Sequence, residues 1–164
     1  MAVAKACGKS MIAIRRNTAR ALRRASELGP NASAKAMLAA ALLLQGKKSE
    51  ALEAVEQEPD DCWRLEIAAV VYWELDRKPE SDAALSRLQT QCPQNVSYNI
   101  AEAHAFRGEV DAACAWLQRA YREQDTGMMM IRVDPLLRNL HRDPRYLALV
   151  AKMKLDGEPP AALR

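Results

Sequence analysis

The sequence predicts an all-α protein, organised as a solenoid of antiparallel helix hairpins followed by a helical cap. Three observations predict this fold: a composition dominated by Ala and Leu, a small number of Gly and Pro, and an internal repeat. Ala and Leu rank highest in helix propensity. Only 6 Gly and 8 Pro occur in 164 residues, which argues against many short strands joined by turns. No apolar run approaches the roughly 18 residues that a membrane span needs.

The internal repeat consists of a largely apolar helix end, then Gly or Asp, then a polar stretch and a second, Ala-rich helix. The break residues Gly46, Asp76 and Gly108 stand 30 and 32 residues apart. Gly and Asp can adopt the left-handed conformation that ends a helix and reverses the chain. We therefore expect each segment to fold as an antiparallel hairpin. The segments are 42–55, 72–85 and 104–117.

Small residues follow each break at the same spacing, at Ala51, Ser81 and Ala113. A small side chain lets two helices approach closely, so these positions are predicted helix crossings. Larger apolar residues recur four positions later, on the same helical face. The predicted inward residues are Val55, Leu85 and Leu117 of the second helices, and Leu38, Leu42, Ala68, Tyr72, Ile100 and His104 of the first helices.

This repeat resembles the tetratricopeptide repeat, which has a period of 34 residues. With Gly108 at the turn glycine of the family, Ile100 and Ala101 match its Leu-Gly pair. Ala113 and Ala120 then match the two alanines of its second helix. Further matches are Ala68, Ala69, Tyr72 and Pro93 in the middle repeat, and Leu38, Ala39, Gly46 and Ala51 in the first.

The chain departs from the family pattern at several positions. Leu42 and His104 stand where the family usually has an aromatic residue, Asp76 replaces the turn glycine and Ser81 replaces an alanine. Pro59 comes early and shortens the second helix of the first repeat. These departures weaken single repeats and leave the period intact.

The resemblance implies one right-handed superhelical domain over residues 11–155. Its ending resembles that of the repeat modules found at the end of bacterial regulators, cyclases and kinase-like proteins. The predicted parts are a flexible start at 1–10, an orphan helix at 11–28, repeats at about 32–59, 62–93 and 95–125, a cap at 127–155 and a flexible tail at 156–164.

Two Asp-Pro pairs predict the helix starts of the cap, because Asp is a good N-cap and Pro suits the first helical turn. The first helix should begin at Pro135 and the second at Pro144. The methionines at 128–130 either fill gaps under the cap or form an exposed binding surface. The residues expected to cover the last repeat are Leu136, Leu140, Leu147 and Val150.

No pattern in the sequence predicts an enzyme, a cofactor or a metal centre. We find no set of nucleophile, base and acid, and His104 with Cys114 would supply only two metal ligands. The four cysteines form no C-x-x-C pair. Cys62 and Cys92 stand one repeat apart, and stacked helices lie about 8–10 Å apart, beyond easy disulfide reach. We therefore expect free, mostly buried thiols in a reducing cytoplasm.

The resemblance implies a non-enzymatic module that binds a protein or peptide along its concave surface, which the first helices line. The expected groove combines aromatics with carboxylates and has no Lys or Arg, so a basic or apolar segment is the predicted ligand. It lacks the Lys and Asn clamp of the family's chaperone-binding members. Alternatively, Trp63 and Trp73 are core residues between repeats. The predicted groove residues are Trp63, Glu66, Val70, Trp73, Glu74, Tyr98, Glu102 and Phe106.

Positive charge concentrates near the N-terminus. Residues 1–30 contain seven Lys or Arg and one Glu, a net charge of +6, whereas residues 31–164 carry −3. Three interpretations of this basic segment are open. It is the solvated face of a packed helix, an arm that binds a membrane or nucleic acid, or an organelle transit peptide. An unfinished N-terminal end also allows a homodimer, which makes an oligomerising regulatory fragment the second functional hypothesis. The arginines of this helix are Arg15, Arg16, Arg20, Arg23 and Arg24.

Overall fold

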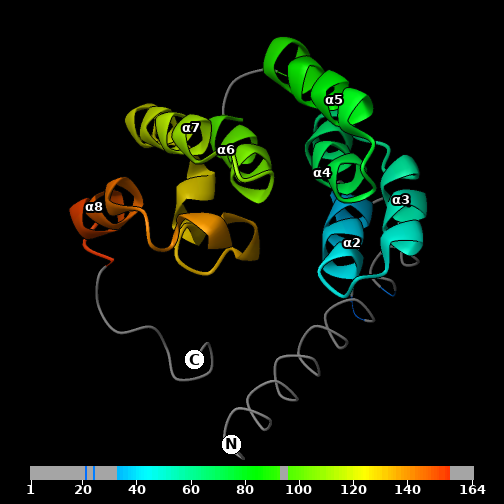
Figure 1. The fold of residues 1–164 in the computed structure, drawn as a ribbon, viewed down its shortest axis with the longest axis horizontal. Helices are drawn as coiled ribbons and strands as arrows, with labels where there is room; N and C mark the ends of the chain where they lie inside the picture. The colour runs from blue at the N-terminus through cyan, green and yellow to red at the C-terminus, as the bar shows by residue number, and fades with distance from the viewer. Residues whose placement is uncertain (1–20, 22–23, 25–32, 93–95, 156–164) are drawn as a thin grey trace, which may run out of the picture. The chain divides into compact units, whose positions relative to one another are not determined.

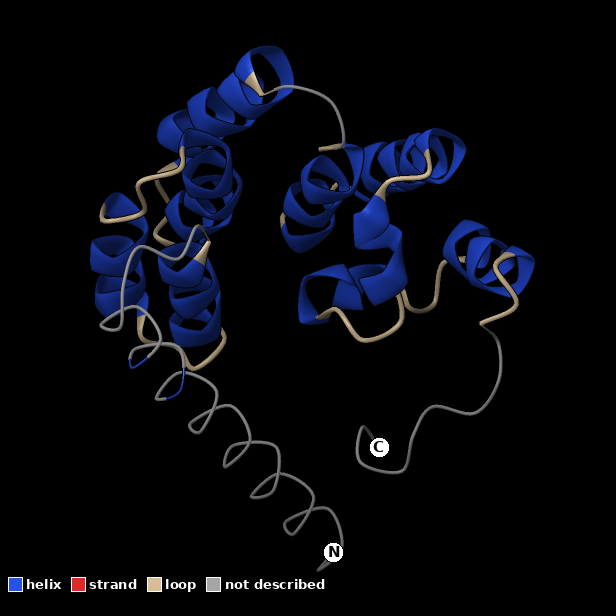
Figure 2. Ribbon diagram, turned by 180° about the vertical axis from the view of Figure 1, so that it is seen from behind, coloured by secondary structure: helices blue, strands red, loops and turns tan. Residues whose placement is uncertain are grey.

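A computed structural model describes residues 21, 24, 33–92 and 96–155 of the chain (Figure 1). Within these ranges the regular structure is helical and contains no strand (Figure 2). The all-α class is therefore confirmed, while the solenoid arrangement stays a prediction. The elements are α2 (Ala34–Leu43), α3 (Lys48–Glu56), α4 (Asp61–Glu74), α5 (Lys78–Gln91), α6 (Ser97–Phe106), α7 (Val110–Glu123), the 3-10 helices η1 (Thr126–Met130) and η2 (Pro135–Leu140), and α8 (Pro144–Lys152).

Contacts divide the chain into two compact units, Met1–Ala84 and Leu85–Arg164, with the boundary inside α5. We describe each unit by itself, so the predicted single domain over 11–155 stays a prediction. Of the predicted orphan helix, only Ala21 and Arg24 are described, and both are helical and exposed. The predicted flexible ends lie outside the described residues.

Left-handed residues end the first helix of each hairpin at the predicted positions. The φ angle is 78° at Gly46, 58° at Asp76 and 79° at Gly108. The N–H of Lys47 donates to the carbonyl of Leu42 at 3.0 Å, and equivalent bonds close the other two turns. A hydrogen bond from an N–H group to the carbonyl five residues earlier is the signature of the Schellman motif. It satisfies a carbonyl that the end of the helix would otherwise leave unpaired. The three turns are thus confirmed.

Two further helices end in the same way, at residues that give no turn signal in the sequence. Gln124 follows α7 with a φ angle of 56°, and Lys154 follows α8 with a φ angle of 57°. The N–H of Asp125 then donates to Ala120 at 2.9 Å. Neither Gln nor Lys favours this conformation, so tertiary packing fixes it.

Small side chains lie at the helix crossings, as the repeat predicts. Ala51, Ser81 and Ala113 are fully buried. The hydroxyl of Ser81 donates to the carbonyl of Ala69 on α4 at 2.5 Å, so serine replaces alanine here without an unsatisfied polar group. The predicted inward leucines and valine are buried as well, namely Leu38, Leu42, Val55, Leu85 and Leu117.

In the second unit, the cap completes the core that α6 and α7 begin. Asp134 and Asp143 serve as N-caps, as predicted, and accept from the N–H groups of Leu136 and Arg145. The segment at Pro135 is a 3-10 helix. The buried cluster consists of Tyr98, Ala101, Ala105, Ala113, Cys114, Leu117, Ala120, Met128, Ile131, Leu137, Leu140, Tyr146, Leu149 and Val150.

One expectation for the cap is wrong. Leu147 is exposed, whereas Leu136, Leu140 and Val150 are buried as expected. The buried side of α8 follows the spacing of Tyr146, Leu149 and Val150, so Leu147 points away from it. Of the methionine run, Met128 is buried under the cap while Met129 and Met130 are exposed, and binding by the exposed methionines stays a prediction.

We expect Gly46→Ala to destabilise the first unit by about 1 kcal/mol through backbone strain alone. A Cβ at Gly46 would meet nothing within 4 Å, so no clash contributes. Gly46→Asn should lose less, because Asn tolerates the left-handed conformation. Urea unfolding measures the free energy of unfolding of both variants. Equal losses of stability would show that the left-handed conformation of residue 46 does not determine the effect.

We expect Ala113→Leu to overpack the α6–α7 crossing and to cost about 1–3 kcal/mol. Ala115→Leu is the matched control on the same helix, because Ala115 is exposed. Thermal unfolding of the two variants distinguishes the sites. An unchanged midpoint for Ala113→Leu would show that Ala113 does not lie at a helix crossing.

Candidate functional site

A buried carboxylate organises the start of α4. Glu58 is 1% exposed and lies in the turn between α3 and α4. Its carboxylate accepts from the N–H of Ala36 at 2.9 Å and from that of Asp60 at 3.1 Å. The first of these groups is an otherwise unpaired donor in the first turn of α2. Glu58 therefore joins the beginning of α2 to the beginning of α4.

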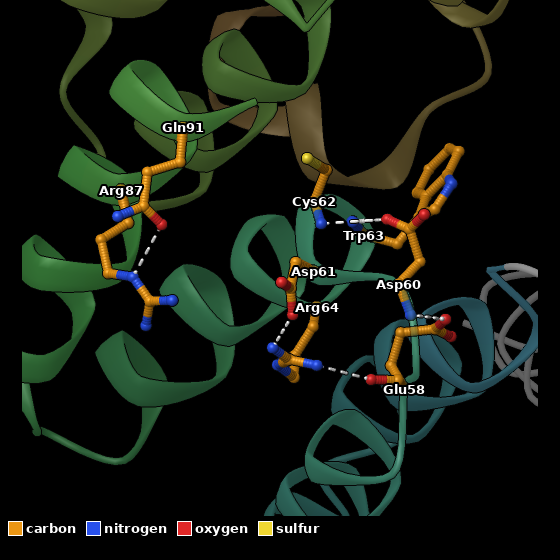
Figure 3. A network of polar contacts seen from close by, with 8 residues as sticks. All are labelled: Glu58, Asp60, Asp61, Cys62, Trp63, Arg64, Arg87 and Gln91. Carbon is orange, nitrogen blue, oxygen red and sulfur yellow. Dashed lines mark hydrogen bonds and ion pairs between the residues drawn. The ribbon is translucent and has the colours of Figure 1, made fainter. Parts of the chain in front are cut away.

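The N-cap of α4 positions an exposed tryptophan. The side chain of Asp60 accepts from the N–H groups of Cys62 at 2.9 Å and Trp63 at 3.1 Å (Figure 3). These bonds fix the backbone of the first turn. The side chain of Trp63 nevertheless remains 40% exposed. A large aromatic group is thus presented to solvent from a rigid backbone.

Arg64 supports the same turn from the next position (Figure 3). Its guanidinium donates to the carbonyl of Glu58 at 2.9 Å and pairs with Asp61. Glu56, Asp60 and Asp61 are exposed around this turn. Within the described residues Arg64 pairs with Asp61, and the nearby ammonium of Lys35 donates to Gln57 at 3.1 Å, so the exposed carboxylates of this turn exceed its basic groups by one.

The other predicted groove residues of α4 differ in accessibility. Glu66 and Val70 are buried, contrary to the expected exposure, whereas Trp73 and Glu74 are partly exposed. Trp63 and Trp73 are ten residues apart, which is about 15 Å along a helix. They therefore do not form one aromatic cluster.

Lysines from outside the first helix reach the end of α4. Lys48 of α3 contacts the carboxylate of Glu74 at 2.9 Å, and the ammonium of Lys78 lies 5.4 Å from the ring centre of Trp73. The sequence register places no Lys or Arg among the groove residues. Because helices pack side by side, the structure supplies these charges from α3 and from the start of α5.

In the second unit, the face of α6 that was expected to bind a ligand is covered by the cap. Tyr98 is 3% exposed, and its hydroxyl donates to the carboxylate of Asp134 at 2.9 Å. Burial, the charge of Asp134 and that of Glu102 raise the pKa of Tyr98 far above its usual value. A Cβ at Gly127 would lie within 3 Å of the Tyr98 ring, so the backbone of η1 packs directly against it.

Glu102 and Phe106 also lie beneath or beside the cap. Glu102 is buried and Phe106 is partly exposed. The side-chain amide of Asn139 in η2 donates to the carbonyl of Ala105 at 2.8 Å. The expected exposure of Tyr98 and Glu102 is therefore wrong, because residues 126–140 occupy this face.

Asp125 repeats in the second unit the role that Glu58 has in the first. It is buried, and its carboxylate accepts from the N–H of Tyr98 at 3.0 Å and from that of Gly127 at 2.9 Å. Sequence inspection missed both carboxylates. The available signals were weak: a Pro after Glu58, and a Thr-Gly pair after Asp125 that suits a tight turn.

A polar cluster lies between α7 and the start of α8. Arg145 contacts Asp143 and Asp111, each at 2.8 Å, and hydrogen bonding to Arg145 holds the pKa of Asp143 well below its usual range. The sulfur of Cys114 lies 3.7 Å from Asp143. Burial and the nearby carboxylate raise the pKa of this thiol, which lowers its reactivity.

The cysteines differ from the expectation of free thiols. Cys62 and Cys92 are disulfide-bonded, whereas Cys114 is free and buried as expected. Cys7 lies outside the described residues. The sequence argument used the distance between stacked repeats. The expectation that Cys62 and Cys92 are free thiols is therefore wrong.

The described residues contain no group of three or more His, Cys, Asp or Glu that could hold a metal ion. None of the described helices has the length and apolar character to cross a membrane. Of the arginines predicted to form a basic helix, Arg15, Arg16, Arg20 and Arg23 lie outside the described residues.

Comparisons with protein-family models, with curated proteins and with solved structures find no match to this chain. The resemblance to the tetratricopeptide repeat therefore stays an expectation from the sequence. What the structure brings together is local: Trp63 with exposed carboxylates at the start of α4.

We expect Tyr98→Phe to destabilise the second unit by about 1–3 kcal/mol, because it removes a buried hydrogen bond to a carboxylate. Tyr121→Phe is the matched control, since no hydrogen bond involves the Tyr121 hydroxyl within the described residues. Thermal unfolding compares the two. Equal midpoints would contradict a structural role for the Tyr98–Asp134 bond.

Proposed function

We propose that this chain is a non-enzymatic interaction module that binds a basic or apolar peptide segment of a partner protein. The binding surface is the start of α4, with Trp63 as the aromatic anchor. The observation that carries the proposal is the exposure of Trp63 on a backbone fixed by Asp60. Trp is strongly enriched among the residues that dominate binding energy.

Charge supports a basic ligand. Glu56, Asp60 and Asp61 are exposed at this turn, and they exceed its two basic groups, Arg64, which pairs with Asp61, and Lys35, which donates to Gln57. An excess of carboxylates beside an anchor accelerates association with a basic segment and rejects acidic ones. The proposal narrows the predicted groove to α4, because Tyr98 and Glu102 of α6 are buried under the cap.

The resemblance to tetratricopeptide repeats supports the same class of function. Modules of this kind bind peptides through the first helices of their hairpins, and α4 is the first helix of the middle repeat. The alternatives, a homodimer through the N-terminal end and binding of nucleic acid or a membrane surface, involve residues 1–30. Apart from Ala21 and Arg24, these lie outside the described residues, so no contact supports them.

The test uses the full chain and a fluorescein-labelled peptide that carries Leu and Lys at helical spacing. We expect binding by fluorescence anisotropy, and about tenfold or greater weakening in Trp63→Ala. Glu56→Lys should mainly slow association, because it reverses a charge at the rim. Circular dichroism checks that both variants remain helical.

Met37→Ala is the matched control, since Met37 is an exposed apolar residue of the same unit, on α2. It should bind the peptide as the unchanged chain does. The proposal fails if Trp63→Ala binds normally, or if a peptide with Glu in place of Lys binds more tightly at this site.

A further inference from the structure

The cap presents exposed apolar side chains to solvent. Met129 is 79% exposed and Met130 is 53% exposed, and Val133 is exposed as well. The N–H of Val133 donates to the carbonyl of Met130 at 2.9 Å, so one tight turn holds the three residues together. Methionine is flexible and polarisable, which suits it to binding apolar partners of varied shape.

The charge of the cap is opposite to that of the helices before it. Residues 126–155 contain six Arg or Lys and two Asp, a net charge of +4. Residues 31–125 contain ten basic and sixteen acidic residues, a net charge of −6. The basic character of the cap is thus a separate feature from the arginines of residues 1–30.

The two acidic groups of the cap are already engaged. The carboxylate of Asp134 accepts from Tyr98 and from the N–H of Leu136, and it is buried. Asp143 pairs with Arg145 at 2.8 Å. Neither carboxylate is available to neutralise the remaining basic side chains.

Five basic residues of the cap therefore lack a carboxylate partner within the described part of the chain. Elsewhere in that part, most Lys and Arg pair with a nearby acid, as Lys47 does with Glu50 and Arg119 with Glu123. The five residues of the cap are Arg132, Arg138, Arg142, Lys154 and Lys152, whose ammonium lies 4.6 Å from the ring centre of Tyr121.

Contacts of Tyr146 bring the methionine turn close to the loop before α8. The Tyr146 hydroxyl donates to the carbonyl of Ile131 at 2.6 Å, and its ring stacks on His141 at 5.5 Å. Burial raises the pKa of Tyr146 to about 12, and the positive charge of Arg132 opposes that rise. Arg132 therefore lies near this contact, and Arg142 follows His141 directly.

We infer that the surface formed by Met129, Met130, Arg132, Val133 and Arg142, here called the basic–methionine surface, binds an acidic amphipathic segment of a partner protein. The methionines and Val133 take up its apolar side chains, and the two arginines pair with its carboxylates. Charge complementarity selects this occupant, because the arginines have no carboxylate in the described chain. The inference is independent of the proposed α4 site, which has the opposite charge.

The test uses the full chain and a fluorescein-labelled peptide that carries Leu and Glu at helical spacing. We expect the unchanged chain to bind it, with an affinity that falls as salt increases. Met129→Gln with Met130→Gln, and Arg132→Gln with Arg142→Gln, should each weaken binding by about tenfold or more. The same peptide with Gln in place of Glu should bind less tightly.

Matched controls separate this surface from other exposed groups. Met37→Gln changes an exposed methionine of the first unit, and Arg122→Gln changes an exposed arginine of α7. Both controls should bind the acidic peptide normally. Trp63→Ala should also bind it normally, so failure of the α4 proposal and failure of this one are distinguishable. Circular dichroism and the thermal midpoint confirm that the exposed substitutions leave the fold intact.

Three results would overturn the inference. The first is equal peptide affinity in the unchanged chain and in either double variant. The second is capture of the chain by vesicles of phosphatidylcholine and phosphatidylserine with no binding of the peptide, which would assign the surface to a membrane. The third is binding of a single-stranded oligonucleotide that depends on Arg132 and Arg142 but not on the methionines, without peptide binding.

Discussion

The unpaired N–H groups at the start of a helix are the constraint on which the α2–α3 and α6–α7 hairpins depend. In each unit, a buried carboxylate beyond the second helix satisfies donors in the first turn of the first helix. Glu58 serves Ala36, and Asp125 serves Tyr98, over separations of 22 and 27 residues. A carboxylate buried without such donors would be costly, so these bonds require the hairpin to be closed. The same groups place the next element, since Glu58 also accepts from Asp60 and Asp125 from Gly127.

Closing the hairpins in this way determines which surfaces remain for partners. In the second unit, Asp125 directs the chain into η1, and the cap then covers Tyr98. In the first unit, Glu58 leads directly into the N-cap of α4, and Trp63 stays exposed on the following turn. Related closures therefore produce an acidic aromatic surface in one unit and a basic–methionine surface in the other. The two proposed partner segments therefore differ in charge.

The sequence predicts those parts of the fold that depend on local signals. Gly46 and Gly108 end helices because glycine readily adopts the left-handed conformation. Each Asp-Pro pair begins a helix through bonds and geometry within that helix alone. Glu58 and Asp125 escaped prediction because their partners are distant in sequence. The exposure of Leu147 depends on how α8 rotates against the core, which its spacing alone does not fix. For the site, the sequence identifies Trp63 but does not predict the burial of Tyr98. This burial depends on the position at which residues 126–140 pack against α6. The disulfide-bonded state of Cys62 and Cys92 likewise has no signal in the local sequence.

Native-state hydrogen exchange of the backbone amides of Ala36 and Tyr98 tests the central claim most directly. First-turn amides ordinarily exchange quickly because they lack an intrahelical acceptor. The reference is Ser49 in the first turn of α3, a helix that begins without a side-chain cap. The carboxylate bonds predict that Ala36 and Tyr98 are protected as strongly as amides inside α2 and α6, while Ser49 exchanges quickly. Exchange of Ala36 and Tyr98 as fast as that of Ser49 would contradict the account.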